Sequence, residues 1–404
     1  MHPKEVIQKS AARALNALLS KYFPVSSKGP SSRLQARVVD KYISQVRTED
    51  NPAATRGFTL ALGHLPAKVL APSCEVLDSV LSCLCDASRK ESLVGGEGDA
   101  ETRRNAITSL VNVCTIVGID EDENSLCEGE SFPIYRLRKK QIDRVFGSLL
   151  AAMNDYNVDR RGDVGSWARI AAMDGLEALV KMSIEASTSF PHSSSQCSDN
   201  PTEDVVAPSL KKRIEFLTED RSADFQHSSY ANSDKMLFDE QLCCSILSAL
   251  LKQLGEKLDV VRCKAGECLE RLLTNDSPRL PFVPNRNMLF LALNLNEPNK
   301  NWSDPVQTFP LLMKAALIDD FIEPILSGIV ISVGGLTESV SKSSSASLFE
   351  WIRELRAAKA TPKLFRMGEG EMIMQRLKRY HIMQFSNPTH LPFLVSLSWP
   401  VPSV

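Results

Sequence analysis

The chain has 404 residues, of which 43% are hydrophobic and 6% are aromatic, and its formal net charge is -2. This length supplies ample material for a core, and the low aromatic share favours helices packed through aliphatic side chains. A nearly neutral charge excludes the broad basic face of a nucleic-acid-binding protein. The ten cysteines follow no disulfide spacing, so we expect reduced thiols in a cytoplasmic protein.

Apolar residues recur at helical spacing along most of the chain, and no segment alternates convincingly as a strand. Proline and glycine lie between the apolar runs, where antiparallel helix pairs need turns. Helices are predicted over about 4–22, 33–48, 52–64, 73–88, 99–117, 136–154, 163–184, 236–254, 257–274, 285–295, 306–334 in pieces, and 341–359. The pattern therefore predicts an all-α fold, a HEAT/armadillo-like α-solenoid of antiparallel helix pairs.

Composition divides this chain into four parts. Residues 1–185 are predicted to form HEAT-like helical repeats, and residues 235–360 to continue them. Residues 186–234 are rich in Ser, Asp and charged side chains, so we expect a disordered polar insert. Residues 361–404 form an atypical tail that is expected to be poorly ordered. The most apolar stretch, residues 325–333, is far shorter than the ~20 residues that span a bilayer, so no membrane span is predicted.

The first predicted helix carries an apolar face at the very beginning of the chain. Its members are Ile7, Ala11, Ala14, Leu15, Leu18 and Tyr22. The ends of a solenoid normally present a polar outer face, and this helix does not. We therefore expect another helix to cover the face, either in a longer array or in a second copy of the chain.

The helix predicted over residues 163–184 is the most informative element. Asp163 is expected to cap it, because a carboxylate there accepts hydrogen bonds from the first turn and opposes the helix dipole. Trp167 falls on the apolar stripe and is predicted to be a core residue whose change to Ala costs ~3 to 5 kcal/mol. The small side chains expected to let a neighbouring helix approach closely are Ala168, Ala171, Ala172 and Gly175.

Arginines occupy similar places in four predicted helices. They are Arg56, Arg104, Arg169 and Arg262. The first two are separated by close to the ~40 to 47 residues of a HEAT or armadillo unit, and polar segments account for the longer gaps that follow. Recurrence favours a structural role over a catalytic one, since aligned polar residues commonly connect neighbouring repeats of a solenoid.

Motifs that would carry chemistry are incomplete. Asp120, Asp122 and Asn124 begin like a calcium-binding loop. Ser125 and Ser131, however, stand where that loop needs Gly and a bidentate Glu. Cysteines and histidines form no paired array with metal-ligand spacing, and neither a nucleophile elbow nor a Walker motif is present. We therefore predict no catalytic, cofactor-binding or metal-binding residues, and no cofactor.

Four strings are more specific than a generic helical repeat. They are residues 55–63 (TRGFTLALG), 161–173 (RGDVGSWARIAAM), 277–284 (SPRLPFVP) and 328–339 (GIVISVGGLTES). With these strings, the chain resembles the C-terminal part of the tubulin-folding cofactor D family, over about residues 5–360 apart from the polar insert. The resemblance departs at both ends, because family members have many more repeats and different closing helices.

The resemblance implies a non-catalytic, cytoplasmic scaffold chaperone that binds β-tubulin and also associates with microtubules. It implies that such a protein joins cofactors C and E in assembling the α/β-tubulin heterodimer, contributes to GTPase activation of tubulin within that complex, and contacts an Arf-like small GTPase. The alternative is a generic HEAT-repeat scaffold, such as a transport receptor or a phosphatase subunit. An enzyme with an unrecognised site is a third class.

Overall fold

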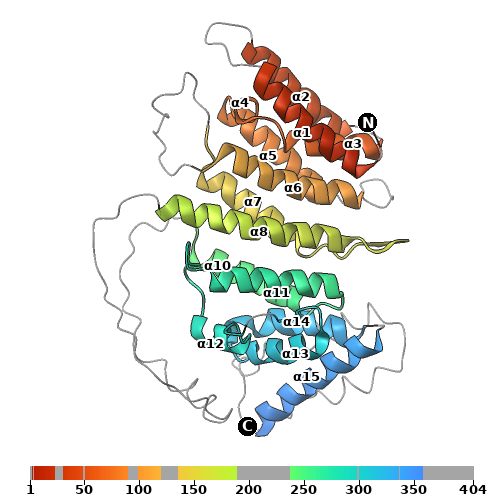
Figure 1. Cartoon of the computed structure of the whole chain (residues 1–404), viewed down its shortest axis with the longest axis vertical. Helices are drawn as coiled ribbons and strands as arrows, with labels where there is room; N and C mark the ends of the chain where they lie inside the picture. The colour runs from red at the N-terminus through yellow and green to blue at the C-terminus, as the bar shows by residue number, and fades with distance from the viewer. Residues whose placement is uncertain are drawn as a thin grey trace, which may run out of the picture. The chain divides into compact units, whose positions relative to one another are not determined.

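The computed structural model describes residues 2, 4–22, 31–48, 51–89, 99–119, 135–188, 237–297, 300–335 and 337–357. Within these ranges the chain is almost entirely α-helical, with a single two-stranded hairpin (Figure 1). The predicted all-α, helical-repeat class is therefore confirmed. Apart from residues 186–188, the predicted insert at 186–234 and the whole tail at 361–404 lie outside the described residues, as does the loop that begins like a calcium site.

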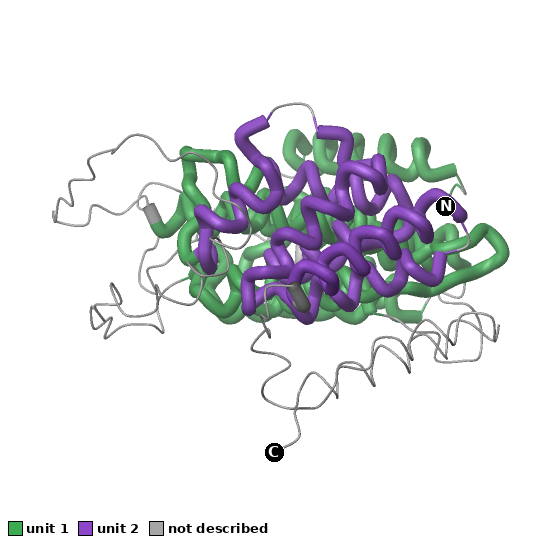
Figure 2. Tube along the Cα trace, turned by 90° about the horizontal axis from the view of Figure 1, so that it is seen from below, with its two compact units in different colours: residues 1–192, 231–246, 271–282 green, residues 193–230, 247–270, 283–404 purple. Residues whose placement is uncertain are grey.

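The chain divides into two compact units (Figure 2). Unit 1 comprises residues 1–192, 231–246 and 271–282, and the remaining residues form unit 2. The helices of unit 1 are α1 (Glu5–Tyr22), α2 (Ser31–Thr48), α3 (Pro52–Leu62), α4 (Ala67–Leu70), α5 (Cys74–Arg89), α6 (Ala100–Val117), α7 (Lys139–Ala152) and α8 (Gly165–Thr188). Those of unit 2 are α12 (Arg286–Ala292), α13 (Pro305–Ala315), a 3-10 turn (Asp319–Phe321), α14 (Ile322–Val333) and α15 (Glu338–Ala357). Helices α10 (Glu240–Leu254) and α11 (Asp259–Thr274) contribute residues to both units.

Local signals start several of these helices. Asn51 caps α3 through its side chain, which accepts a hydrogen bond from the backbone N–H of Ala53 at 3.0 Å. Pro52 follows at the first helical position, where its missing N–H leaves no hydrogen bond unmade. Asp99 caps α6 in the same way, accepting from the N–H of Thr102 at 3.0 Å. These caps explain why the predicted starts of both helices agree with the observed ones within a residue.

In unit 1, helix α6 packs against α3, α5 and α8. Its inward side chains include Leu110 and Val113, which are fully buried. Helix α8 approaches α6 and α7 closely at Gly175, where an added Cβ would lie 2.7 Å from a methyl group of Val111 and 3.1 Å from one of Leu149. The prediction that small residues of this helix permit close approach is confirmed at Gly175.

In unit 2, α14 lies against the C-terminal end of α10. An added Cβ at Gly328 would be 2.1 Å from the carbonyl oxygen of Lys252. One turn later, the hydroxyl of Ser332 donates to the carbonyl of Gly255 at 2.6 Å and so satisfies a carbonyl at the end of α10. Backbone approach and side-chain capping thus act together at this contact.

Two elements were not predicted. Helix α4 is a single turn between Pro66 and Pro72, too short to show a helical period. The second is the hairpin that precedes α8, formed by antiparallel strands β1 (Val158–Asp159) and β2 (Gly162–Asp163). Two residues a strand show no alternation, so the expectation of no strand was wrong at this place. Gly162 has a φ of +100°, which a side chain would strain.

The cysteines in the described ranges are all free thiols. Burial raises the pKa of Cys114 to about 12, so this thiol is a core group with little nucleophilic character. Cys127 and Cys197 lie outside the described residues. Among the described helices, none combines the length and the apolar character that crossing a membrane requires.

Two glycine substitutions test the close contact between α10 and α14. Gly328→Ala is expected to lower the free energy of unfolding by about 1–3 kcal/mol, because the new methyl group would overlap the Lys252 carbonyl. Gly147→Ala in α7 is the control, since nothing lies within 4 Å of the added Cβ, and it is expected to raise stability by about 0.5–1 kcal/mol. Urea denaturation followed by circular dichroism measures both. Equal effects would contradict the backbone contact.

Candidate protein-interaction surface

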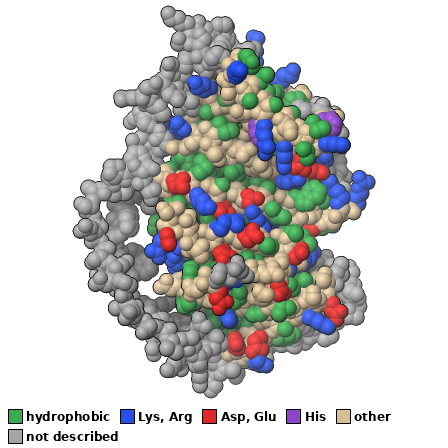
Figure 3. Space-filling model, in the orientation of Figure 1, with side chains coloured by type: hydrophobic (Ala, Val, Ile, Leu, Met, Phe, Trp, Pro, Cys, Tyr) green, Lys and Arg blue, Asp and Glu red, His purple; other side chains and the backbone are tan. Residues whose placement is uncertain are grey.

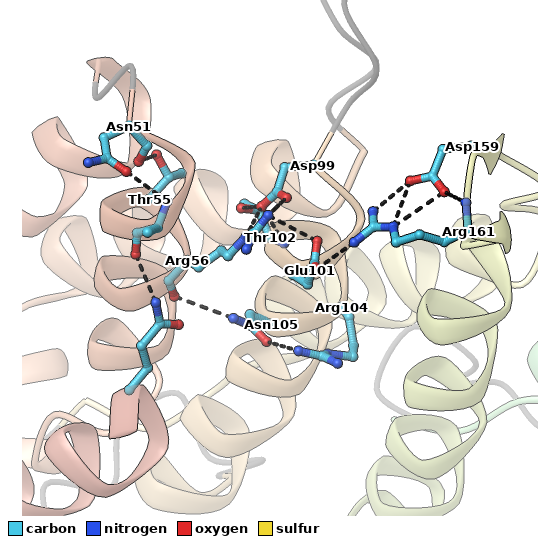
Figure 4. A network of polar contacts seen from close by, with 12 residues as sticks. Asn51, Thr55, Arg56, Asp99, Glu101, Thr102, Arg104, Asn105, Asp159 and Arg161 are labelled. Atoms are coloured by element: carbon cyan, nitrogen blue, oxygen red, sulfur yellow. Dashed lines mark hydrogen bonds and ion pairs between the residues drawn. The ribbon is translucent and has the colours of Figure 1, made fainter. Parts of the chain in front are cut away.

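Arg56 connects two helices of unit 1. It projects from α3 toward the start of α6, and its Nε donates to Asp99 Oδ2 at 2.8 Å (Figure 4). Asn105 adds a second link, because its Nδ2 donates to the Arg56 carbonyl at 3.4 Å. The hydrogen bond to Asp99 raises the pKa of Arg56. Since Asp99 also caps α6, the Arg56 side chain binds the residue that begins that helix.

Arg169 is fully buried at the start of α8. One of its nitrogens donates to Asp163 Oδ2 at 3.0 Å, and another donates to the backbone carbonyl of Asp155 at 2.6 Å. Its guanidinium carbon lies 4.4 Å from the centre of the Tyr156 ring. Asp163 also accepts from the N–H of Ser166 at 3.0 Å, so it caps the helix as predicted. The contacts of Arg169 are those of a structural residue.

Arg262 makes the corresponding contacts in unit 2. Its Nη1 donates to the carbonyls of Glu256 and Lys257, both at 2.9 Å, and its Nη2 donates to the carbonyl of Ser303. The guanidinium carbon lies 5.4 Å from the centre of the Phe309 ring. Burial lowers the pKa of Arg262. Arg169 and Arg262 therefore both bind carbonyls of the segment that precedes their helix.

Arg104 of α6 pairs with Glu5 of α1 and so connects two helices, as the structural interpretation predicts. Its neighbour Arg103 is the buried residue, with a side chain 4% exposed and its Nε 2.7 Å from Asp155 Oδ2. Arg104 is 23% exposed and lies 3.1 Å from Glu5 of α1. Consecutive residues of a helix point about 100° apart, and the sequence does not show which of two adjacent arginines faces the neighbouring helix.

Trp167 is a partly exposed residue, and the prediction that it lies in the core was wrong. Two guanidinium groups lie near its ring, with the Arg161 carbon 4.9 Å and the Arg104 carbon 6.0 Å from the ring centre. Arg161 comes from the turn of the β1–β2 hairpin, which the sequence did not reveal. We call Glu5, Arg104, Arg161 and Trp167 the arginine–tryptophan cluster.

Carboxylates hold Arg161 in position. Its Nη2 is 2.6 Å from Asp159 of the same hairpin, and its Nη1 donates to Glu101 of α6 at 2.8 Å. Figure 4 shows Arg161 reaching from the hairpin toward Glu101. The hydrogen bonds raise the pKa of Arg161, first through Asp159, and lower the pKa of Asp159. The hairpin is thereby joined to the start of α6, so Arg161 is held beside Trp167.

The cluster has the composition of a protein-binding surface. Trp and Arg are the residues that most often dominate binding energy at interfaces, and an arginine over an aromatic face gains cation–π attraction. Exposed apolar side chains lie next to it in the chain: Val6 follows Glu5 and is 76% exposed, and Val158 precedes Asp159 and is 68% exposed. The described ranges contain no group of three His, Cys, Asp or Glu that could hold a metal ion.

Comparison with known proteins shows which sequences this chain resembles. Residues 244–381 match the family model of the tubulin folding cofactor D C terminal. Tubulin-specific chaperone D of Dictyostelium discoideum is 25% identical over 355 residues, which is 87% of this chain and 22% of the relative. The chain is therefore similar to the C-terminal part of cofactor D over residues 244–381 and to a tubulin-specific chaperone D over most of its length. The chain spans about a fifth of the length of that relative.

The matched range of the cofactor D model includes residues 361–381, which composition assigned to the atypical tail. The arginine–tryptophan cluster lies before that range. Among solved structures, the crystal structure of an engineered protein is 12% identical, with 89% of this chain and 80% of that chain covered. Its TM-score of 0.27 is too low to support any argument about the fold.

Replacing the two adjacent arginines separately tests which one is structural. Arg103→Met is expected to lower the free energy of unfolding by about 3–5 kcal/mol, because Asp155 would keep a buried carboxylate without this cation. Arg104→Met removes a partly exposed pair and is expected to cost less than about 1 kcal/mol. Urea denaturation gives both values. A larger loss for Arg104→Met would contradict the conclusion that the more deeply buried Arg103 contributes more to stability.

Acid should weaken the link between α3 and α6. Burial raises the pKa of Asp99, but hydrogen bonds from Arg56 and Thr102 outweigh burial, so the pKa lies below the ordinary 3.8. When a carboxyl has a lower pKa in the folded state than in the unfolded state, its ionisation stabilises the fold at pH values above the unfolded-state pKa. This stabilisation is lost as the pH falls through the folded-state pKa. Asp99→Asn lacks the titrating group. The difference in melting temperature between wild type and Asp99→Asn is therefore expected to stay constant above about pH 5 and to shrink as the pH falls below the ordinary pKa of 3.8. A difference that stays constant at those lower pH values as well would contradict the role of Asp99.

Proposed function

We propose that this chain is a scaffold chaperone that binds β-tubulin and takes part in post-chaperonin assembly of the α/β-tubulin heterodimer. The observation that carries the proposal is the agreement of two matches, one to the cofactor D C-terminal model over residues 244–381 and one to a tubulin-specific chaperone over most of the chain. A fold of stacked helices suits this task, because it presents a large continuous surface to a folded partner.

The proposal assigns no chemistry to the chain itself. Its contribution to GTPase activation of tubulin is that of a component in a complex with cofactors C and E, and an Arf-like small GTPase is a further partner. The location that fits these partners is the cytoplasm, with association with microtubules. All of these assignments rest on the similarity to cofactor D.

Within unit 1, the arginine–tryptophan cluster is the surface proposed to contact β-tubulin. Trp167 is partly exposed and therefore contributes less to the core than a fully buried tryptophan. Ion pairs hold Arg104 and Arg161 near its ring, so these two side chains would lose little entropy when a partner binds. Val6 and Val158 supply exposed apolar area next to the cluster.

Retention of β-tubulin tests the proposal. The immobilised full chain is incubated with a eukaryotic cell lysate, and bound β-tubulin, cofactors C and E, and actin are quantified by immunoblot. We expect β-tubulin to be retained in large excess over actin. Absence of β-tubulin, while a longer homologous chain retains it in parallel, would show that this part of a cofactor D-like protein lacks the activity.

Two variants locate the contact. Trp167→Ala is expected to reduce β-tubulin retention several-fold, whereas Val306→Ala, at a 65% exposed valine in α13 of unit 2, is expected to leave it unchanged. Circular dichroism confirms that both variants are folded. Unchanged retention by Trp167→Ala would place the contact elsewhere on the chain.

A further inference from the structure

Helix α1 is anchored to unit 1 by one face. The buried residues of this face are Gln8, Ala12 and Leu19. Gln8 Nε2 donates to the carbonyl of Ala53 at 3.0 Å, which attaches α1 to the first turn of α3. Near the other end, Asn16 Nδ2 donates to the carbonyl of His64 at 2.6 Å. The inner face and these two amides hold α1 in place without its outer face.

The outer face of α1 is apolar and exposed. It consists of Ile7, Ala11, Ala14, Leu18 and Tyr22. Ile7 is 44%, Leu18 is 52% and Tyr22 is 66% exposed. Steps of three and four residues place all five on one stripe, as in the seam of a helix pair. This is the face predicted from the sequence to be covered by another helix, and the described residues leave it open.

Exposed cations lie on α1 and on α2. Lys4, Arg13 and Lys21 on or next to α1, and Arg37 and Lys41 on α2, form no ion pair with any carboxylate among the described residues. The whole chain has a net charge of -2, so the excess of positive charge is local. Figure 3 shows Lys and Arg side chains around hydrophobic ones at the end of unit 1 that α1 and α2 form.

We propose that the outer face of α1 binds an acidic amphipathic helix of a partner protein. The apolar side of that helix would lie along the stripe, where Ala11 and Ala14 allow close approach. Lys4 and Lys21 lie at opposite ends of α1, about 25 Å apart at 1.5 Å per residue. Carboxylates near both ends of the partner helix would pair with these lysines.

The charge and the side-chain sizes of the outer face of α1 disfavour two other binding partners, a second copy of the chain and a membrane surface. A second copy of the chain would bring Lys4 and Lys21 of one α1 against the same cations of the other, at an energetic cost. A membrane surface attracts cations too, but interfacial helices insert bulky side chains, and the centre of this stripe is Ala11 and Ala14. A protein helix with negative charge can pack closely against Ala11 and Ala14 and can pair with Lys4 and Lys21.

A pair of synthetic peptides tests the proposal on the full chain. Each is a fluorescein-labelled helix of about 18 residues, long enough to cover α1, with leucines at heptad spacing. One peptide has glutamates on its flanks and the twin has lysines at the same positions. Fluorescence anisotropy at low salt is expected to show micromolar binding of the glutamate peptide and at least tenfold weaker binding of the lysine twin.

Matched substitutions locate the binding. Leu18→Glu is expected to weaken binding of the glutamate peptide at least tenfold, and Lys21→Glu to weaken it several-fold. Leu291→Glu in α12 of unit 2 is the control, because Leu291 has the same 52% exposure as Leu18, and it is expected to have no effect. All three residues are exposed, and circular dichroism confirms folding before each titration.

Four results would overturn the proposal. They are equal affinity for the two peptides, undiminished binding by Leu18→Glu, dimerisation in analytical ultracentrifugation that Leu18→Glu abolishes, and binding to phosphatidylserine-containing vesicles that Leu18→Glu abolishes. The last two would identify a second copy or a membrane as the occupant. None of these measurements involves tubulin, so the proposed tubulin binding can fail while this proposal stands, and the reverse.

Discussion

The arrangement of unit 1 depends on the contacts that Asp155 makes with two buried arginines. Asp155 lies in the connection between α7 and α8. Arg103 of α6 binds its carboxylate and Arg169 of α8 binds its backbone carbonyl, so this one residue is attached to both α6 and α8. Removing a buried cation would leave a carboxylate without compensation, which makes this contact costly to break. The β1–β2 hairpin follows Asp155 in the chain, so the contacts of Asp155 also fix the position of the hairpin.

The buried contacts of Asp155 also affect which residues unit 1 presents at its surface. The N–H of Gly165 donates to the carbonyl of Asn157 at 3.0 Å, which closes the segment that contains the hairpin. The hairpin in turn presents Arg161 to Trp167 and to Glu101. The contact of Trp167 with Arg161 therefore depends on the hairpin that follows Asp155. The surface proposed to bind β-tubulin and the interior of unit 1 are parts of one hydrogen-bonded structure.

Arginine suits this role for a chemical reason. Its guanidinium group carries five N–H donors in a rigid plane and keeps its charge when buried, so one side chain can satisfy several carbonyl or carboxylate oxygens. Arg262 does so with three carbonyls in unit 2. The two outward-facing surfaces use charge differently. Ion pairs inside the chain occupy Arg104 and Arg161, whereas Lys4 and Lys21, at the two ends of α1, have no such partners among the described residues.

The sequence by itself determined the all-α class, most helix boundaries and the similarity to cofactor D. These depend on local information: apolar spacing, and caps such as Asp99 and Asp163 whose hydrogen bonds lie within one turn. Only the tertiary structure decided that Arg103 rather than Arg104 is buried, that Trp167 is partly exposed, and that a two-residue-per-strand hairpin supplies Arg161. Periodicity shows which residues share a face of a helix, but not which neighbour covers that face. The partners of Asp155 and Trp167 are far away in the sequence, so only folding brings them together.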